Sequence, residues 1–137
     1  GWSFLNYACN KISGKNPDAV RYLISKGADM THVCKSDSWS PLFQIISFSK
    51  SEKLIKYAID KHIEAGLSLN MENSNGESII ERIFDRCDGN IVLYALQKII
   101  KQNEKVVGYD NLVEHLTYRE FPNNETIKRY LNQVKSN

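Results

Sequence analysis

Apolar residues recur at spacings of three and four along several stretches of the chain, which is the periodicity of a helix with one buried face. A half-buried strand would instead place an apolar residue at every second position. The apolar stripes comprise Val20, Leu23 and Ile24, then Leu54, Ile55, Ala58 and Ile59, and then Ile91, Val92, Ala95, Leu96 and Ile99. The pattern therefore predicts amphipathic helices and little or no regular strand.

Signals for helix starts precede these stripes and also precede shorter apolar runs between them. Ser40 followed by Pro41 offers a hydroxyl at the N-cap and a preset φ at the first helical position. Ser78 lies three residues before Glu81, which is the spacing of a capping box. Further starts are expected at Asn16, Ser49, Asp88 and Asn124. The order of these signals predicts pairs of helices.

Glycines mark the expected ends of the second helices. Gly27 and Gly66 follow the first two apolar stripes, where a helix needs a residue that tolerates the left-handed conformation. A short polar segment then leads to the next helix start, and Ser74-Asn75-Gly76 has the composition of a tight turn. The expected unit is a helix, a second helix and a finger-like turn.

The signal for the first helix of each pair recurs along the chain. The segments around Ser3, Ser40 and Ser78 align, and a fourth copy has Asp110 in place of the serine. Their spacing falls within the period of roughly 20 to 50 residues that is typical of repeat proteins. We therefore expect an array of similar units, in which each unit buries its apolar face against its neighbours.

The repeated unit resembles the ankyrin repeat. Gly27-Ala28-Asp29 matches the Gly-Ala-Asp that follows the second helix in that family, and Ser40-Pro41-Leu42 is similar to the Thr-Pro-Leu that opens the first helix. Elsewhere Phe4 and Ile79 replace the family proline, and Asn6, Phe43 and Glu81 replace the family histidine. The resemblance implies an all-α fold, an ankyrin-like solenoid of antiparallel helix pairs joined by finger-like turns.

The resemblance also implies a single ankyrin-repeat domain over residues 1–137. Its approximate units are residues 1–32, 33–70, 71–107 and a degenerate capping unit, 108–137. The second helix of the second unit is expected to be lengthened. A cap needs a polar outer face, and the residues expected to supply it are Glu114, Arg119, Lys128, Arg129, Asn132 and Gln133.

Composition changes this picture little. The 137 residues suit one compact domain, and a formal net charge of +2 predicts neither nucleic acid nor an anionic membrane as a partner. No apolar stretch approaches the roughly 18 residues that span a bilayer, and no secretory signal is evident. Three cysteines without pairing pattern favour reduced thiols, so we expect an intracellular protein, cytoplasmic or nuclear, that is monomeric and not inserted in a membrane.

The sequence shows no recognised catalytic or metal-binding pattern. A phosphate-binding glycine loop, a His-Glu-x-x-His run and a nucleophile elbow are all missing from it. His32 beside Cys34 is a weak candidate nucleophile pair, and the three histidines, His62 and His115 included, are expected at the surface. We expect no enzyme activity, no cofactor and no metal. Nucleic acid is an unfavoured partner because the aromatic residues do not follow the lysines.

In the ankyrin family a concave face of finger tips and first helices binds proteins. Carried over to this chain, that face implies a protein-binding set: Trp2, Tyr7, Ser36, Asp37, Trp39, Gln44, Ser74, Asn75, Glu77, Arg82 and Tyr109. Trp39 is the strongest candidate for a recognition residue, because it precedes the N-cap Ser40 and is expected to be exposed. The alternative is that Trp2 and Trp39 pack along neighbouring fingers and stabilise the array.

The resemblance implies a non-catalytic protein–protein interaction module, a scaffold that binds a partner protein through the concave face. The alternative is a regulatory or substrate-docking ankyrin array of a larger enzyme, because the chain starts at Gly1 and the natural protein can be longer. An excess of lysine over arginine, with many Ile and Asn, suggests an A/T-rich genome. Divergent ankyrin arrays of this kind occur in viral and bacterial effectors that act in the host cell cytosol.

Overall fold

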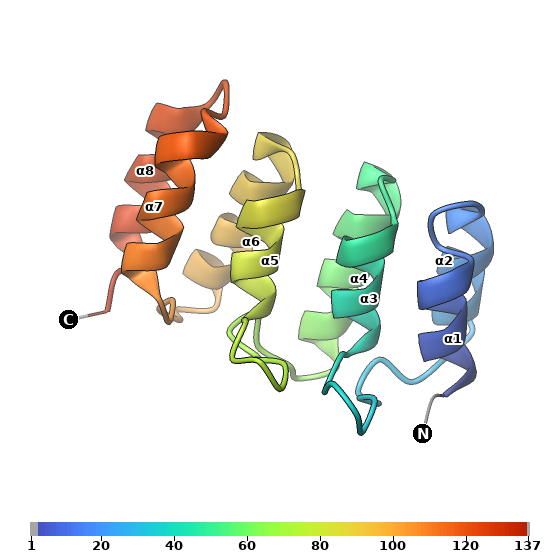
Figure 1. Cartoon of the computed structure of the whole chain (residues 1–137). Coiled ribbons are helices and arrows are strands. Elements are labelled where there is room, and N and C mark those ends of the chain that lie inside the picture. Colours follow the sequence, from blue (N-terminus) through green and yellow to red (C-terminus); the bar gives the residue numbers. More distant parts are fainter. Residues whose placement is uncertain (1–2, 137) are drawn as a thin grey trace. The chain divides into compact units, whose positions relative to one another are not determined.

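The computed structural model describes residues 3–136. Within that range the chain forms eight α-helices, and the only β pairing is an isolated bridge between Glu72 and Ser78 (Figure 1). The helices are α1 (Phe4–Lys11), α2 (Pro17–Ser25), α3 (Pro41–Phe48), α4 (Glu52–Glu64), α5 (Ile79–Arg86), α6 (Gly89–Lys101), α7 (Tyr109–Arg119) and α8 (Asn124–Gln133). The predictions of an all-α fold and of fingers without regular strand are confirmed.

The helices divide between two compact units. The N-terminal unit, Gly1–Ile79, contains α1 to α4, and the C-terminal unit, Ile80–Asn137, contains α5 from its second residue onward with α6 to α8. Each unit has its own apolar interior. The prediction of one domain over residues 1–137 stays a prediction.

In the N-terminal unit two helix pairs lie side by side (Figure 1). Within each pair the helices contact one another, and α1 packs against α3 while α2 packs against α4. The shared interior is built from apolar side chains that are at most 4% exposed: Leu5, Ala8 and Cys9, Val20 and Ile24, Leu42, Ile45 and Ile46, and Leu54, Ala58 and Ile59. Full burial of one leucine or isoleucine contributes about 1.5–3 kcal/mol, so these stripes provide most of the stability of the unit.

The interior of the C-terminal unit is centred on α6 and α8, which pack against each other. Its buried side chains include Ile91, Ala95, Leu96 and Ile99 of α6, Leu112 and Leu116 of α7, and Ile127 and Leu131 of α8. The segment that leads into α7 also lies beside the end of the chain, because the Val106 amide donates to the Val134 carbonyl at 2.9 Å. The C-terminal residues are thereby held against the unit.

Most helix starts agree with the sequence prediction. Ser3, Asn16 and Ser40 are N-caps whose side chains accept a backbone N–H of the first turn, and Pro17 and Pro41 occupy the first turns of α2 and α3. α5 begins directly after Ser78, and α6 directly after Asp88. These starts are local features that the chain encodes within three or four residues.

Three helix starts are displaced from the prediction. The N-cap of α4 is Ser51 and not Ser49, because the Ser49 amide still bonds to the Ile45 carbonyl at the end of α3. The N-cap of α8 is Asn123, so Asn124 is its first residue. The N-cap of α7 is Gly108, and Asp110 therefore lies in the first turn instead of capping the helix.

The glycines that were predicted to end the second helices do so. Gly27 and Gly66 have φ values of 92° and 86°, the left-handed conformation in which a residue with a Cβ is strained. α4 spans 13 residues against nine for α2, so the predicted lengthening of this helix is confirmed. The chain therefore leaves each helix pair of the N-terminal unit through a glycine-dependent turn into a finger.

Candidate protein-interaction surface

The first finger, residues 28–39, is closed by hydrogen bonds within itself. Near its start, the hydroxyl and the backbone N–H of Thr31 donate to the Asp29 carboxylate at 2.6 and 2.8 Å. These two bonds lower the pKa of Asp29, because they favour its charged form. At the tip, the Cys34 amide donates to the Trp39 carbonyl at 3.1 Å. The finger is thus a folded loop with a defined tip.

The second finger, residues 67–78, is organised by Asn73. Its backbone N–H donates to the Glu77 carbonyl at 2.9 Å, and its side-chain oxygen accepts the N–H groups of Asn75 and Glu77 at 2.9 and 3.0 Å. Gly76 supplies the positive φ, 79°, that the turn requires. The tight turn predicted here is confirmed. Sequence reasoning did not single out Asn73, although an asparagine at the first position of a turn is a known signal for such bonding.

The two finger tips are joined directly. The backbone N–H of Ser74 donates to the Asp37 carbonyl at 2.9 Å, and the Asp37 carboxylate accepts the Trp39 N–H at 2.9 Å. Asp37 therefore uses its backbone to hold the second finger and its side chain to hold the first. Because both tips lie in the N-terminal unit, the two fingers form one ordered ridge.

Five of the predicted binding residues are brought together on this ridge. Ser36, Ser74 and Asn75 are exposed, while Asp37 and Glu77 are partly buried. We refer to Ser36, Asp37, Ser74, Asn75 and Glu77 as the finger-tip surface. It presents hydroxyl, amide and carboxylate groups, which can exchange hydrogen bonds with the backbone and side chains of another protein.

Trp39 is half-buried beside the finger-tip surface and packs on α3. Its ring centroid lies 4.8 Å from that of Phe43 and 6.1 Å from that of Phe48. These tilted contacts are within the range of favourable aromatic pairs. The expectation that Trp39 is a freely exposed indole is therefore corrected, because one side of the ring supports the N-terminal unit.

Gln44 was predicted to face a partner, and that prediction is wrong. Its side chain has no exposed area. Its carbonyl oxygen accepts the side-chain amide of Asn10 at 2.9 Å, and its own amide approaches the Cys34 sulfur at 3.9 Å. A buried amide needs such partners, so Gln44 connects α1, α3 and the first finger instead of binding another protein.

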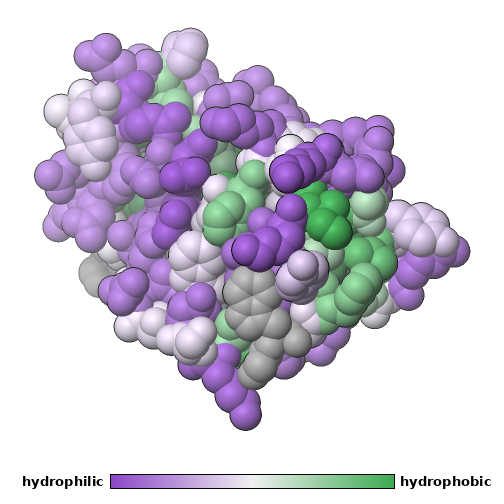
Figure 2. All heavy atoms as spheres, turned by 45° about the vertical axis from the view of Figure 1, so that its right-hand side comes forward, coloured by the Kyte–Doolittle hydropathy of each residue, from purple (hydrophilic) through white to green (hydrophobic). Residues whose placement is uncertain are grey.

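Tyr7 agrees with its predicted place on the exposed side of α1. It is 52% exposed, and Phe4 one turn earlier is 73% exposed. Figure 2 shows that apolar side chains reach the surface on this side of the N-terminal unit. Trp2, which was also predicted to bind, lies outside the described residues.

The two remaining predicted residues belong to the C-terminal unit. Arg82 in α5 and Tyr109 at the start of α7 are both partly buried. The Lys135 ammonium lies 4.9 Å from the centre of the Tyr109 ring. Tyr109 therefore holds the end of the chain by a cation–π contact, and its role in binding stays a prediction.

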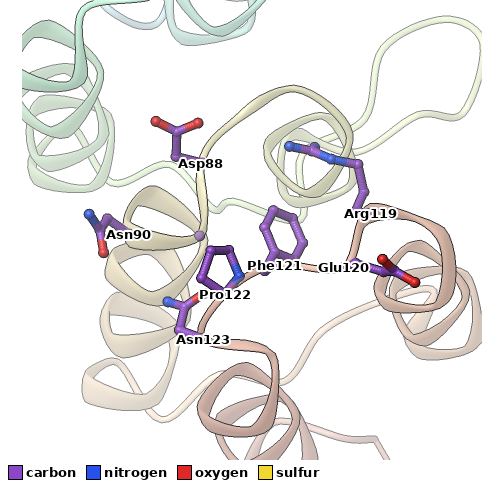
Figure 3. A pocket seen from close by; sticks show the side chains of 8 residues that line it. Asp88, Asn90, Arg119, Glu120, Phe121, Pro122 and Asn123 are labelled. Carbon is purple, nitrogen blue, oxygen red and sulfur yellow. The ribbon is translucent and has the colours of Figure 1, made fainter.

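The C-terminal unit contains a pocket between the start of α6 and the end of α7. Residues 88–90 and 119–123 line it, and Figure 3 shows the Phe121 ring between Arg119 and Pro122. Arg119 donates to the carbonyls of Phe84 and Cys87 at 2.7 and 3.1 Å. Its guanidinium also lies 4.6 Å from the Phe121 ring centre. Arg119 thus connects the end of α7 to the end of α5. The prediction that it lies on a polar outer face is corrected.

The thiols are not suited to nucleophilic chemistry. Cys9, Cys34 and Cys87 are free and buried. Burial raises the pKa of Cys9 and of Cys87 to about 12, and burial also raises the pKa of Cys34. A thiol reacts as its thiolate, so burial disfavours the reactive form of all three groups in the folded protein.

His62 is fully buried in α4, so its predicted place at the surface is wrong. Its Nε2 lies 3.0 Å from the Ser68 carbonyl oxygen, while its Nδ1 has no hydrogen-bond partner among the described residues. Burial lowers the pKa of His62, and the bond to Ser68 opposes that shift. The apolar surroundings therefore favour the neutral imidazole.

Over residues 3–136, no three His, Cys, Asp or Glu side chains gather in a way that would hold a metal ion. In the same range, none of the helices combines the length and the apolar character needed to cross a bilayer. Comparison with protein-family models, with curated proteins and with solved structures finds no match to this chain.

Proposed function

We propose that this chain is a non-catalytic protein-binding module and that the finger-tip surface, with the exposed edge of Trp39, contacts a partner protein. The observation that carries the proposal is the hydrogen bond from the Ser74 N–H to the Asp37 carbonyl, 2.9 Å long. This bond joins two fingers that each have internal bonds, so the exposed polar groups are held in place before a partner arrives.

A preformed surface is suited to binding because little conformational entropy is lost on association. Ordering a rotamer-rich side chain at an interface costs about 0.5–1.5 kcal/mol. Asp37 and Asn73 are already fixed by hydrogen bonds to the Trp39, Asn75 and Glu77 amides. Trp39, supported on one side by Phe43, can add the aromatic contact area that binding surfaces commonly use.

We also propose that the chain is a divergent ankyrin-type array, a solenoid of helix pairs. The contacts of α1 with α3 and of α2 with α4 support this proposal. The left-handed glycine in Gly27-Ala28-Asp29 and the finger that follows it support it as well. In such an array the exposed groups of the fingers are available for partner contacts.

A photo-crosslinking experiment tests the proposed surface. A photoreactive amino acid is placed separately at Ser36 and at Asn75, and at Lys15 as a matched control, since all three positions are exposed in the N-terminal unit. Lys15 lies in the turn between α1 and α2. We expect one defined protein adduct from positions 36 and 75 and none from position 15.

The affinity of the captured partner for the purified chain is then measured by titration calorimetry. We expect the Ser36→Arg variant to weaken binding at least tenfold, about 1.4 kcal/mol, because a bulky cation is added to the surface. The proposal fails if position 15 yields the same adduct, or if no adduct forms at positions 36 and 75.

A further inference from the structure

A second surface of the N-terminal unit lies between α2 and α4, away from the finger-tip residues in sequence. It is an open groove of about 410 Å³. The side chains that line it are Asp18, Arg21, Tyr22, Ser25, Lys53 and Tyr57. Two tyrosines and two cations thus share this groove with one carboxylate and one serine hydroxyl.

The tyrosines hold cations in defined places around this groove. The Arg21 guanidinium lies 4.8 Å from the centre of the Tyr57 ring, and the Lys26 ammonium lies 5.4 Å from that of Tyr22. Stacking restricts a side chain while leaving the edge of a guanidinium free to donate hydrogen bonds. Arg21 is therefore pre-organised to bind a planar anion such as a carboxylate.

The nearby carboxylates do not neutralise these cations. Glu52 pairs with Lys56 at 3.0 Å and Glu64 pairs with Lys61 at 3.4 Å, in both cases within α4. Among the described residues, Arg21, Lys26 and Lys53 form no ion pair; Asp18 alone supplies a carboxylate to the groove. The groove therefore attracts anions, although the whole chain has a formal charge of only +2.

We propose that the groove between α2 and α4 binds an acidic peptide segment. Arg21 binds one carboxylate of the peptide, and Lys53 binds a second carboxylate. Carboxylate is favoured over nucleic acid because single-stranded bases stack on aromatic faces, and a cation already lies over one face of each tyrosine ring of the groove. The Tyr57 ring is flanked by Arg21 and by Lys61, whose ammonium is 5.6 Å from its centre. Charge-assisted bonds to a carboxylate use the remaining donors of the cations instead.

The test uses fluorescence anisotropy with a labelled oligoglutamate peptide, a labelled oligoglutamine peptide and a labelled oligothymidine strand at low salt. We expect the unaltered chain to bind oligoglutamate and not to bind oligoglutamine. The double variant Arg21→Gln with Lys53→Gln should bind oligoglutamate at least tenfold more weakly, about 1.4 kcal/mol. Circular dichroism confirms that the variant is folded.

The matched control is the double variant Arg129→Gln with Lys101→Gln, which removes the same charges from exposed positions of the C-terminal unit. We expect it to bind oligoglutamate nearly as well as the unaltered chain. The proposal is overturned by an equal loss in this control, by tighter binding of oligothymidine at the groove, or by no binding of oligoglutamate. The Ser36→Arg variant should bind the peptide normally, which separates this groove from the finger-tip surface.

Discussion

The two compact units complete the ends of their helices by different means. In the N-terminal unit, Ser3, Asn16, Ser40 and Ser51 each accept a backbone N–H of the helix that they precede. In the C-terminal unit, the residues that precede α6, α7 and α8 make no such bond through a side chain. Capping of the first kind is local, since the cap and the amide are three residues apart.

The C-terminal unit instead uses side chains from distant parts of the chain. Arg119 at the end of α7 reaches the carbonyls of Phe84 and Cys87 at the end of α5. The Lys105 ammonium donates to the Gln133 carbonyl at 3.0 Å. Such bonds satisfy helix ends only after the unit has folded. The N-terminal unit should therefore tolerate the loss of any one cap, whereas the C-terminal unit depends strongly on one arginine.

The largest expected effect is that of Arg119→Ala. This change leaves the Phe84 and Cys87 carbonyls without their charged donor, so we expect the C-terminal unit to lose about 2–3 kcal/mol of stability. Amide hydrogen exchange measured by NMR should show faster exchange in α5 to α8, with α1 to α4 unchanged. Arg119→Lys should recover only part of the loss, because one ammonium cannot reach both carbonyls as the forked guanidinium does. Equal effects on both units would contradict this division.

Next in size is a pair of glycine substitutions, one in each unit. A Cβ at Gly14 would lie 2.6 Å from the Phe48 carbonyl oxygen, a backbone atom that cannot move aside. A Cβ at Gly89 would overlap Asn123 Oδ1, which is a side-chain atom. We expect Gly14→Ala to cost about 2 kcal/mol by overpacking, measured by urea unfolding. Gly89→Ala should cost less, because Asn123 can rotate; a larger cost at Gly89 would refute the reasoning.

A smaller effect is expected at the helix caps. Ser40→Ala removes an observed cap bond to the Phe43 amide and should cost about 1 kcal/mol. Asp88→Ala removes a cap residue that makes no such bond, so only its interaction with the helix dipole is lost, about 0.3 kcal/mol. Thermal unfolding of the two variants gives the comparison. Equal losses would show that capping does not distinguish the units.

The effect that is smallest near neutral pH is acid destabilisation of the N-terminal unit through His62. Its folded-state pKa lies below 6.5, so the unfolded chain binds more protons as the pH falls and stability decreases below that value. The pKa of Asp29 is lowered from 3.8, so protonation of Asp29 reduces stability only at more acidic pH. Hydrogen exchange in α4 from about pH 7 to about pH 5 measures the effect. A His62→Gln variant should lack this pH dependence.

The same difference between local and distant bonds explains what the sequence could predict. Ser40 with Pro41, and the stop at Gly27, are fixed by neighbours in the chain, so the helix pairs and the fingers were predicted correctly. Ser49 and Ser51 are equally good local candidates for a cap, and the packing of α3 decides between them.

The candidate site was predicted less well. The finger-tip residues follow from the turn signals, but the burial of Gln44 depends on Asn10, which lies on a different helix. The burial of His62 and the bonds from Arg119 to the Phe84 and Cys87 carbonyls also depend on residues that are distant along the chain or on tertiary packing. None of these contacts leaves a signal in the spacing of residues along the chain.

The buried cysteines have a consequence for measuring the two units. Cys9 and Cys34 lie in the N-terminal unit and Cys87 lies in the C-terminal unit, and all three are shielded from solvent. A thiol-modifying reagent can reach each sulfur only while the structure around it is transiently open. The rate of modification at each cysteine, followed by mass spectrometry, therefore reports how often its own unit opens. The chain thus contains natural reporters of local opening for both units, with no label added.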